Sequence, residues 1–147
     1  MTDSPHDEKI SGILFVCYGN ACRSPMAEGL AKLIVGENIR IESAGLAPIL
    51  EGATHDAIQV LHEVYGVDIS HHTARSVADI RIALFEKVIV LDTYVFEELK
   101  NRYPSLSERL TLWDIEDPYG QDLGAYRKTA EIIKNLIENH LASLDKI

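Results

Sequence analysis

The stretch CYGNACRS, residues 17–24, decides the fold of this chain of 147 residues. The apolar run ILFV, residues 13–16, precedes it, and a helical pattern begins at Pro25. The thiol of Cys17 therefore follows a predicted buried strand, and Arg23 lies six positions later, near the start of a helix. Backbone N–H groups of the short loop between them can turn inward and make a concave anion site, which the helix N-terminus reinforces. The stretch predicts a phosphate-binding loop with Cys17 as the nucleophile.

An alternative interpretation of this loop is purely structural. A cysteine at the end of a buried strand is often a small core residue, and an arginine near a helix start is common. The glycine, the asparagine and the Arg-Ser pair in a strand-to-helix turn favour the catalytic interpretation, because they all suit an anion-binding loop. Such a loop also favours the thiolate, the nucleophilic form of cysteine. The predicted phosphate-binding residues are Tyr18, Gly19, Asn20, Ala21, Cys22, Arg23 and Ser24.

The composition is ordinary for a soluble globular protein, and the length suffices for one domain with a sizeable core. No apolar run approaches the roughly 20 residues needed to span a bilayer, and the polar, acidic N-terminus is unlike a signal peptide. We therefore expect a cytoplasmic protein with a flexible lead-in over residues 1–10 and one domain over residues 11–147. The net charge of −9 disfavours nucleic acid and anionic membranes as partners, since both need clustered Lys and Arg.

The chain has two cysteines, Cys17 and Cys22, on the same predicted loop. They do not form the disulfide framework of a small secreted protein. They also fall short of the four Cys or His ligands that a structural zinc site usually needs. We expect neither a metal nor another cofactor.

Short apolar segments alternate with amphipathic segments along the chain. The pattern predicts strands at residues 11–16, 39–43, 88–91 and 110–112, and helices at residues 25–35, 54–66, 93–102 and 123–144. Such alternation is typical of an α/β domain whose parallel sheet is covered on both sides. Ligands of these folds bind beyond the carboxyl ends of the strands, where Cys17 is placed.

Four motifs, in this order, carry a resemblance to a known family. They are VCYGNACRSP (16–25) with AE at 27–28, SAG (43–45), GVDIS with HTAR (66–70 and 72–75), and DPY (117–119). With them the chain resembles the low-molecular-weight protein tyrosine phosphatases from residue 11 to residue 144. The resemblance implies a single three-layer αβα domain with a four-stranded parallel sheet and the phosphate loop after the first strand. It also implies a hydrolase of phosphorylated proteins, a monomer or weak homodimer, which phosphate or other oxyanions inhibit.

The resemblance assigns three catalytic residues. Cys17 attacks phosphorus and forms a cysteinyl-phosphate, Arg23 holds two phosphoryl oxygens, and Asp117 protonates the leaving oxygen. Ser24 is placed to hydrogen-bond the Cys17 sulfur. Asp-Pro is also a common turn dipeptide, and Asp114 and Glu116 are nearby carboxylates that could take the role of the acid.

A supporting set of residues is expected behind the loop. Asn20 tolerates the left-handed backbone that an inward-curling loop needs. The resemblance implies that its side chain bonds Ser43 and His72, although His72 could instead be a solvated or core histidine. Asp92, after the third strand, is favoured as a helix cap over a partner of His72. With Ser24, the predicted supporting residues are Asn20, Ser24, Ser43 and His72.

Cys22 lies five residues after Cys17. The resemblance implies that the two cysteines can close a reversible disulfide, which protects Cys17 from over-oxidation. Structural burial of Cys22 is the alternative.

Position 21 is where the chain departs from the family pattern. Tyrosine-directed members often carry a branched apolar residue there, and an arginine-directed branch carries threonine, whereas this chain has Ala21. Tyr18, Ala21 and Tyr119 are predicted to form the walls around the substrate. We favour phosphotyrosine as the substrate, with phosphoarginine as the alternative. Thiol-coupled arsenate reductases share the loop but need further downstream cysteines, and a mere binding module would need neither the nucleophile nor the acid.

Overall fold

The computed structural model describes residues 12–36 and 38–143. The predicted lead-in, residues 1–10, and the outermost residues predicted for the first strand and the last helix, 11 and 144, lie outside the described residues. Four strands form one parallel sheet in the order β2-β1-β3-β4. They are β1 (Ile13–Cys17), β2 (Ile41–Gly45), β3 (Lys87–Val90) and β4 (Leu110–Leu112). The predicted four-stranded parallel sheet is confirmed.

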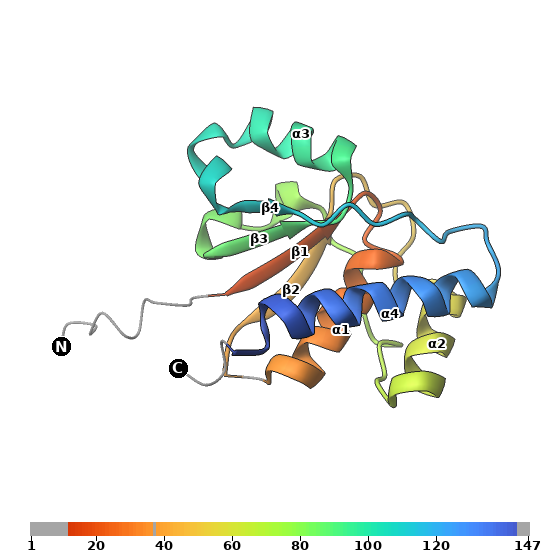
Figure 1. The fold of residues 1–147 in the computed structure, drawn as a ribbon. Coiled ribbons are helices and arrows are strands. Elements are labelled where there is room, and N and C mark those ends of the chain that lie inside the picture. The colour runs from red at the N-terminus through yellow and green to blue at the C-terminus, as the bar shows by residue number, and fades with distance from the viewer. Residues whose placement is uncertain (1–11, 37, 144–147) are drawn as a thin grey trace.

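Helices cover both faces of this sheet, which gives the expected three layers (Figure 1). On one face lie α1 (Arg23–Val35), α2 (His55–Tyr65) and α4 (Leu123–His140), and on the other lies α3 (Thr93–Arg102). The short 3₁₀ segments η2 (Val77–Asp79), η3 (Ile82–Leu84) and η4 (Pro104–Arg109) were not predicted. Among the described residues, no helix is long and apolar enough to cross a membrane.

The alternation of side chains along β1 separates two apolar cores. Phe15 and Cys17 pack with the residues of α1, α2 and α4, whereas Leu14 and Val16 pack with those of α3. Every residue of β1 is buried, because β1 is a central strand with helices on both faces. The central position of β1 in the sheet therefore explains the continuous apolar run that predicted a buried strand.

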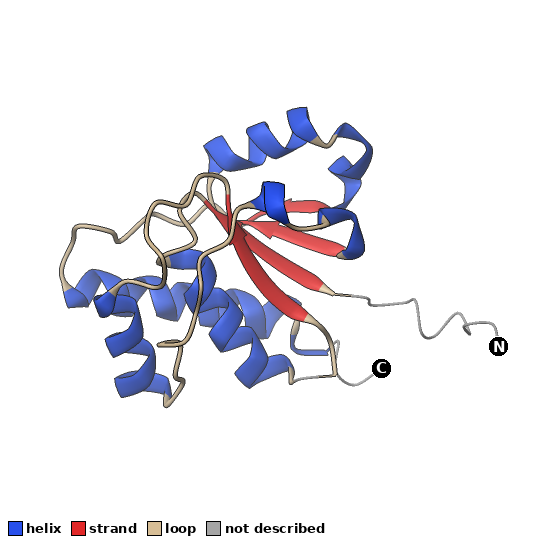
Figure 2. Cartoon of the chain, turned by 180° about the vertical axis from the view of Figure 1, so that it is seen from behind, coloured by secondary structure: helices blue, strands red, loops and turns tan. Residues whose placement is uncertain are grey.

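Several boundaries differ from the prediction. The helix α1 begins at Arg23, two residues before the predicted start at Pro25. Proline is tolerated there because the first N–H groups of a helix have no partner within the helix. The strand β2 is displaced to Ile41–Gly45, since its pairing with β1 begins at Ile41. The loops that follow the strands gather at one end of the sheet, and Cys17 ends β1 there (Figure 2).

Candidate active site

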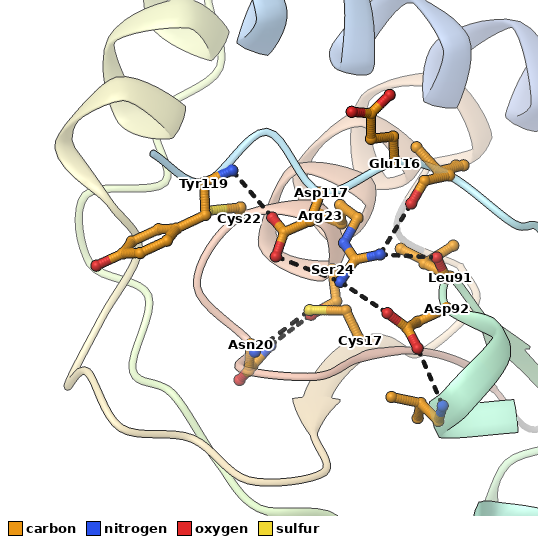
Figure 3. Close-up of polar contacts among 12 residues, drawn as sticks. Cys17, Asn20, Cys22, Arg23, Ser24, Leu91, Asp92, Glu116, Asp117 and Tyr119 are labelled. Atoms are coloured by element: carbon orange, nitrogen blue, oxygen red, sulfur yellow. Dashed lines mark hydrogen bonds and ion pairs between the residues drawn. The ribbon is translucent and has the colours of Figure 1, made fainter. Parts of the chain in front are cut away.

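The loop after β1 curls back on the sulfur of Cys17. Asn20 has a left-handed backbone with φ of 55°, which turns its N–H toward Cys17 Sγ at 3.2 Å. The hydroxyl of Ser24 lies 3.0 Å from the same sulfur (Figure 3). Two groups of the loop therefore lie within hydrogen-bond distance of the Cys17 sulfur, which is itself buried.

The side chain of Asn20 fastens this loop to β2 and to the segment that follows α2. Its Nδ2 donates to Ser24 Oγ at 2.8 Å and to Ser43 Oγ at 3.0 Å, and its Oδ1 accepts from the N–H of Arg75 at 2.9 Å. Ser43 in turn donates to Glu28 Oε1 at 2.6 Å. Asn20 is fully buried, so each of these partners satisfies a polar atom that would otherwise be costly to bury. Glu28 belongs to a quoted motif, but its contact with Ser43 was not predicted.

His72 supports the loop differently from the expectation. Its Nε2 lies 2.9 Å from the backbone carbonyl of Asn20, not from the Asn20 side chain. The carbonyl can only accept, so Nε2 is the donor. The expected contact with the side chain is not made, and the amide oxygen of Asn20 accepts the N–H of Arg75. The neighbouring His71 is exposed and approaches Asp68 instead.

The SAG motif has a glycine at position 45 because the loop after β1 packs closely against this residue. A Cβ at this position would lie 2.8 Å from the backbone nitrogen of Asn20. The loop after β1 packs directly on Gly45, and hydrogen bonds from Leu46 N to Cys17 O and from Ala47 N to Tyr18 O continue this contact. A larger residue would displace the loop that holds Cys17.

Arg23 is buried in the first turn of α1, with only 3% of its surface exposed. Its Nη1 donates to the carbonyls of Leu91 at 3.1 Å and Ile115 at 2.8 Å. Its Nη2 pairs with Asp92 at 3.2 Å and approaches Asp117 at 3.6 Å (Figure 3). In the part of the chain that the structure describes, Nε is buried and has no hydrogen-bond partner. A buried N–H donor without a partner, on a residue that lines the pocket over Cys17, suits an oxyanion.

Asp92 has two functions, of which the sequence indicated one. Its Oδ1 accepts from the N–H of Val95 at 3.1 Å and caps α3, as predicted. Its Oδ2 holds the guanidinium of Arg23. The sequence alone did not indicate the second contact, because it depends on β3 lying beside β1 in the sheet.

Asp117 faces the loop from the segment between β4 and α4. Its Oδ1 accepts from the N–H of Tyr119 at 3.1 Å, which leaves Oδ2 directed toward Arg23 (Figure 3). Asp117 lines the pocket that contains Cys17, whereas Glu116 lines a different hollow and lies near Gln121. Asp114 lines neither. Of the three carboxylates that sequence analysis weighed, only Asp117 is placed beside the nucleophile.

The pocket over Cys17 has mainly apolar walls. The three predicted wall residues all line it, and the segment after β2 adds three more that sequence analysis missed. Of the predicted phosphate-binding residues, Asn20 and Ser24 do not line it, since both are fully buried. The lining residues are Cys17, Tyr18, Gly19, Ala21, Cys22, Arg23, Ala47, Ile49, Leu50, Asp117 and Tyr119.

Cys22 contacts the cap of α2 and a tyrosine of α4. Its Sγ lies 3.4 Å from the Tyr126 hydroxyl and 3.5 Å from Thr54 Oγ1. Both cysteines are free thiols. Burial raises the pKa of Cys22, so its sulfur stays protonated at neutral pH. The two cysteines of one loop therefore have different chemical environments.

Comparison with known proteins places this site in a family. The sequence model of "Low molecular weight phosphotyrosine protein phosphatase" matches residues 12–147. Arsenate reductase 1 of Staphylococcus epidermidis is 35% identical over 128 residues, which cover 86% of this chain and 92% of that protein. Wzb of Vibrio vulnificus, solved in complex with benzylphosphonate, superposes with a TM-score of 0.81 at 27% identity, covering 88% of this chain and 96% of Wzb. The YwlE arginine phosphatase from Geobacillus stearothermophilus superposes with a TM-score of 0.82 at 28% identity, covering 92% of this chain and 94% of YwlE. Since the family model spans nearly the whole chain, this protein belongs to the low molecular weight phosphotyrosine protein phosphatase family.

Proposed function

We propose that this protein is a cysteine-dependent protein phosphatase that hydrolyses phosphotyrosine. The observation that carries the proposal is the convergence of Cys17, Arg23 and Asp117 on one pocket with apolar walls. These three groups supply a nucleophile, a phosphate ligand and a proton donor, which together complete the reaction without a cofactor. We place this activity in the cytoplasm, with phosphorylated proteins as substrates and phosphate or similar oxyanions as inhibitors.

In the first step the thiolate of Cys17 attacks phosphorus, so that an S–P bond forms as the P–O bond to tyrosine breaks. The N–H groups of the loop and Arg23 Nε hold the phosphoryl oxygens. Asp117 gives its proton to the departing phenolic oxygen, which otherwise would leave as an anion. The products of this step are free tyrosine in the peptide and a cysteinyl-phosphate on Cys17.

In the second step Asp117, now a carboxylate, takes a proton from a water molecule that attacks the phosphorus. The S–P bond breaks, inorganic phosphate is released, and Cys17 returns to the thiolate. The hydroxyl of Ser24, 3.0 Å from the sulfur, stabilises the charge that returns to it. Asp117 thus donates a proton in the first step and takes one up in the second.

The walls of the pocket favour phosphotyrosine over phosphoarginine. Tyr18, Leu50 and Tyr119 offer apolar surface to a flat ring. Asp117 is the only carboxylate among the lining residues, and it already approaches Arg23, so the walls offer no further acid to a substrate guanidinium. The similarity to an arginine phosphatase makes phosphoarginine the second candidate.

Ala21 provides the test between these substrates. We expect Ala21→Ile to raise, and Ala21→Thr to lower, the ratio of kcat/KM for phosphotyrosine over phosphoarginine peptides by about tenfold, because the added side chain changes the shape of the pocket wall. The measurement is the rate of phosphate release from matched peptides. Ala78→Thr, at an exposed alanine in η2, is the control and should leave the ratio unchanged. A ratio that neither Ala21 variant changes would show that position 21 does not select the substrate.

Arsenate reduction is disfavoured despite the similarity to arsenate reductases. Thiol-coupled reductases pass a disulfide from the loop to a further cysteine, whereas this sequence has cysteines only at positions 17 and 22. A phosphate-binding module without catalysis is also disfavoured, since the nucleophile and the acid both line the pocket.

We also propose that Cys22 protects Cys17 from over-oxidation. Peroxide oxidises the Cys17 thiolate to a sulfenic acid, and the Cys22 thiol then displaces water from it as the S–S bond forms. In wild type, a thiol reductant should restore most of the activity lost to hydrogen peroxide, whereas Cys22→Ser should recover little. Activity before and after reduction is the measurement. Equal recovery in both proteins would assign Cys22 a structural role only.

A further inference from the structure

Tyr94 places an aromatic ring just outside the pocket. It lies in the first turn of α3, two residues after Asp92, and 59% of its surface is exposed. Its ring contacts that of Tyr18, with centroids 6.3 Å apart and planes tilted by 48°. Tyr18 lines the pocket and is itself 43% exposed. The aromatic wall of the pocket therefore continues outward onto the surface of α3.

The mouth of the pocket that Tyr18 lines is apolar. Four large hydrophobic side chains at the pocket mouth are exposed to solvent: Tyr18, Ile49, Leu50 and Tyr119. Exposed apolar side chains that gather beside a binding pocket mark a recognition surface. A phosphotyrosine in a protein is attached to a chain, and the residues on either side of it must pass over this mouth.

The charges near Tyr94 favour an apolar ligand over a basic one. One turn further along α3, Glu97 lies 3.5 Å from Lys100, and Glu98 lies 3.9 Å from Arg102. Asp92 is occupied by Arg23 and by the cap of α3. The carboxylates closest in sequence to Tyr94 thus already have partners, and the surface that its ring offers is chiefly aromatic.

We propose that Tyr94 and Tyr18 together form an aromatic ledge that binds an apolar side chain next to the phosphotyrosine of the substrate. This inference rests on the proposed function. Tyr94 is then a specificity-determining residue that touches the flank of the substrate and not the reacting atoms. Aromatic rings suit this purpose because they offer large, rigid surface and lose little freedom on binding.

The test compares phosphotyrosine peptides that carry leucine, alanine or lysine at each position next to the phosphotyrosine. Wild type should prefer leucine over alanine at one of these positions by about fivefold in kcat/KM, as expected for burial of part of an apolar side chain. Tyr94→Ala should bring this ratio close to one, and Tyr94→Phe, which keeps the ring, should preserve it. Leu33→Ala, which alters an exposed apolar residue on α1, should preserve the ratio as well.

Several outcomes would contradict the proposal that Tyr94 and Tyr18 bind an apolar side chain of the substrate. A wild-type enzyme that cleaves all the peptides equally would refute it while leaving the phosphatase proposal intact, whereas an enzyme that cleaves neither these peptides nor p-nitrophenyl phosphate would refute the phosphatase proposal. A preference for lysine that Tyr94→Ala removes would assign the ring to a cation instead. If Tyr94→Ala changes only the sedimentation coefficient, Tyr94 belongs to a contact between copies of this chain. If it lowers the rates of all substrates alike, including p-nitrophenyl phosphate, Tyr94 supports the loop instead.

Discussion

The Cys17→Ser variant is expected to lower kcat/KM for p-nitrophenyl phosphate by about 10⁴-fold or more. Serine is nearly isosteric with cysteine and can keep the hydrogen bonds to Asn20 N–H and Ser24. The loop should therefore keep its shape, and only the nucleophile is lost. The effect is large because a neutral serine hydroxyl is a far weaker nucleophile than a cysteine thiolate.

Two measurements separate a lost nucleophile from a damaged loop. Steady-state release of p-nitrophenol gives the rate, and calorimetric titration with inorganic phosphate tests whether the N–H groups and Arg23 still bind an oxyanion. Cys22→Ser is the matched control, since the same substitution in the same loop should keep most of the activity. Full activity in Cys17→Ser, or loss of phosphate binding together with activity, would contradict the role of Cys17 as the nucleophile.

The elements that sequence analysis predicted well are those with local causes. Thr54 caps α2 through its own side chain, and Gly66 ends it with a left-handed backbone, so both boundaries depend on neighbouring residues alone. The buried run of β1 and the sharp turn at Asn20 belong to the same class. These features follow from side-chain chemistry within a few positions and are therefore visible in one sequence.

The contacts that were missed join segments far apart in the chain. Arg23 meets Asp92 only because β3 pairs beside β1, and Glu28 meets Ser43 only because α1 packs against β2. No local pattern records which carboxylate a buried guanidinium will find. The positions of Ile49 in the pocket and of Tyr94 just outside it were not predicted for the same reason, since these residues come from segments that meet only in the fold.

The Asp117→Asn variant should slow hydrolysis of phenyl phosphate by about 10²–10⁴-fold. With p-nitrophenyl phosphate, the first step, which forms the cysteinyl-phosphate, should slow much less. Phenol is a poor leaving group that needs the proton of Asp117, whereas p-nitrophenol leaves readily without it. Asparagine can still accept the N–H of Tyr119, so the turn that presents residue 117 should persist. Glu116→Gln and Asp114→Asn are matched controls, because these carboxylates lie in the same segment but do not line the pocket over Cys17.

Rapid mixing distinguishes proton transfer from a merely electrostatic influence of Asp117 on Arg23, whose Nη2 lies 3.6 Å from the carboxylate. Without a base for the second step, Asp117→Asn should accumulate cysteinyl-phosphate from p-nitrophenyl phosphate and release a burst of p-nitrophenol equal to the enzyme concentration. An electrostatic role predicts instead that both substrates slow by the same factor, with no burst. A leaving-group effect in Glu116→Gln would transfer the role of the acid to that residue. The dependence on the leaving group, combined with the burst, is therefore the pattern that only a proton carrier at position 117 produces, because one side chain must then serve both steps.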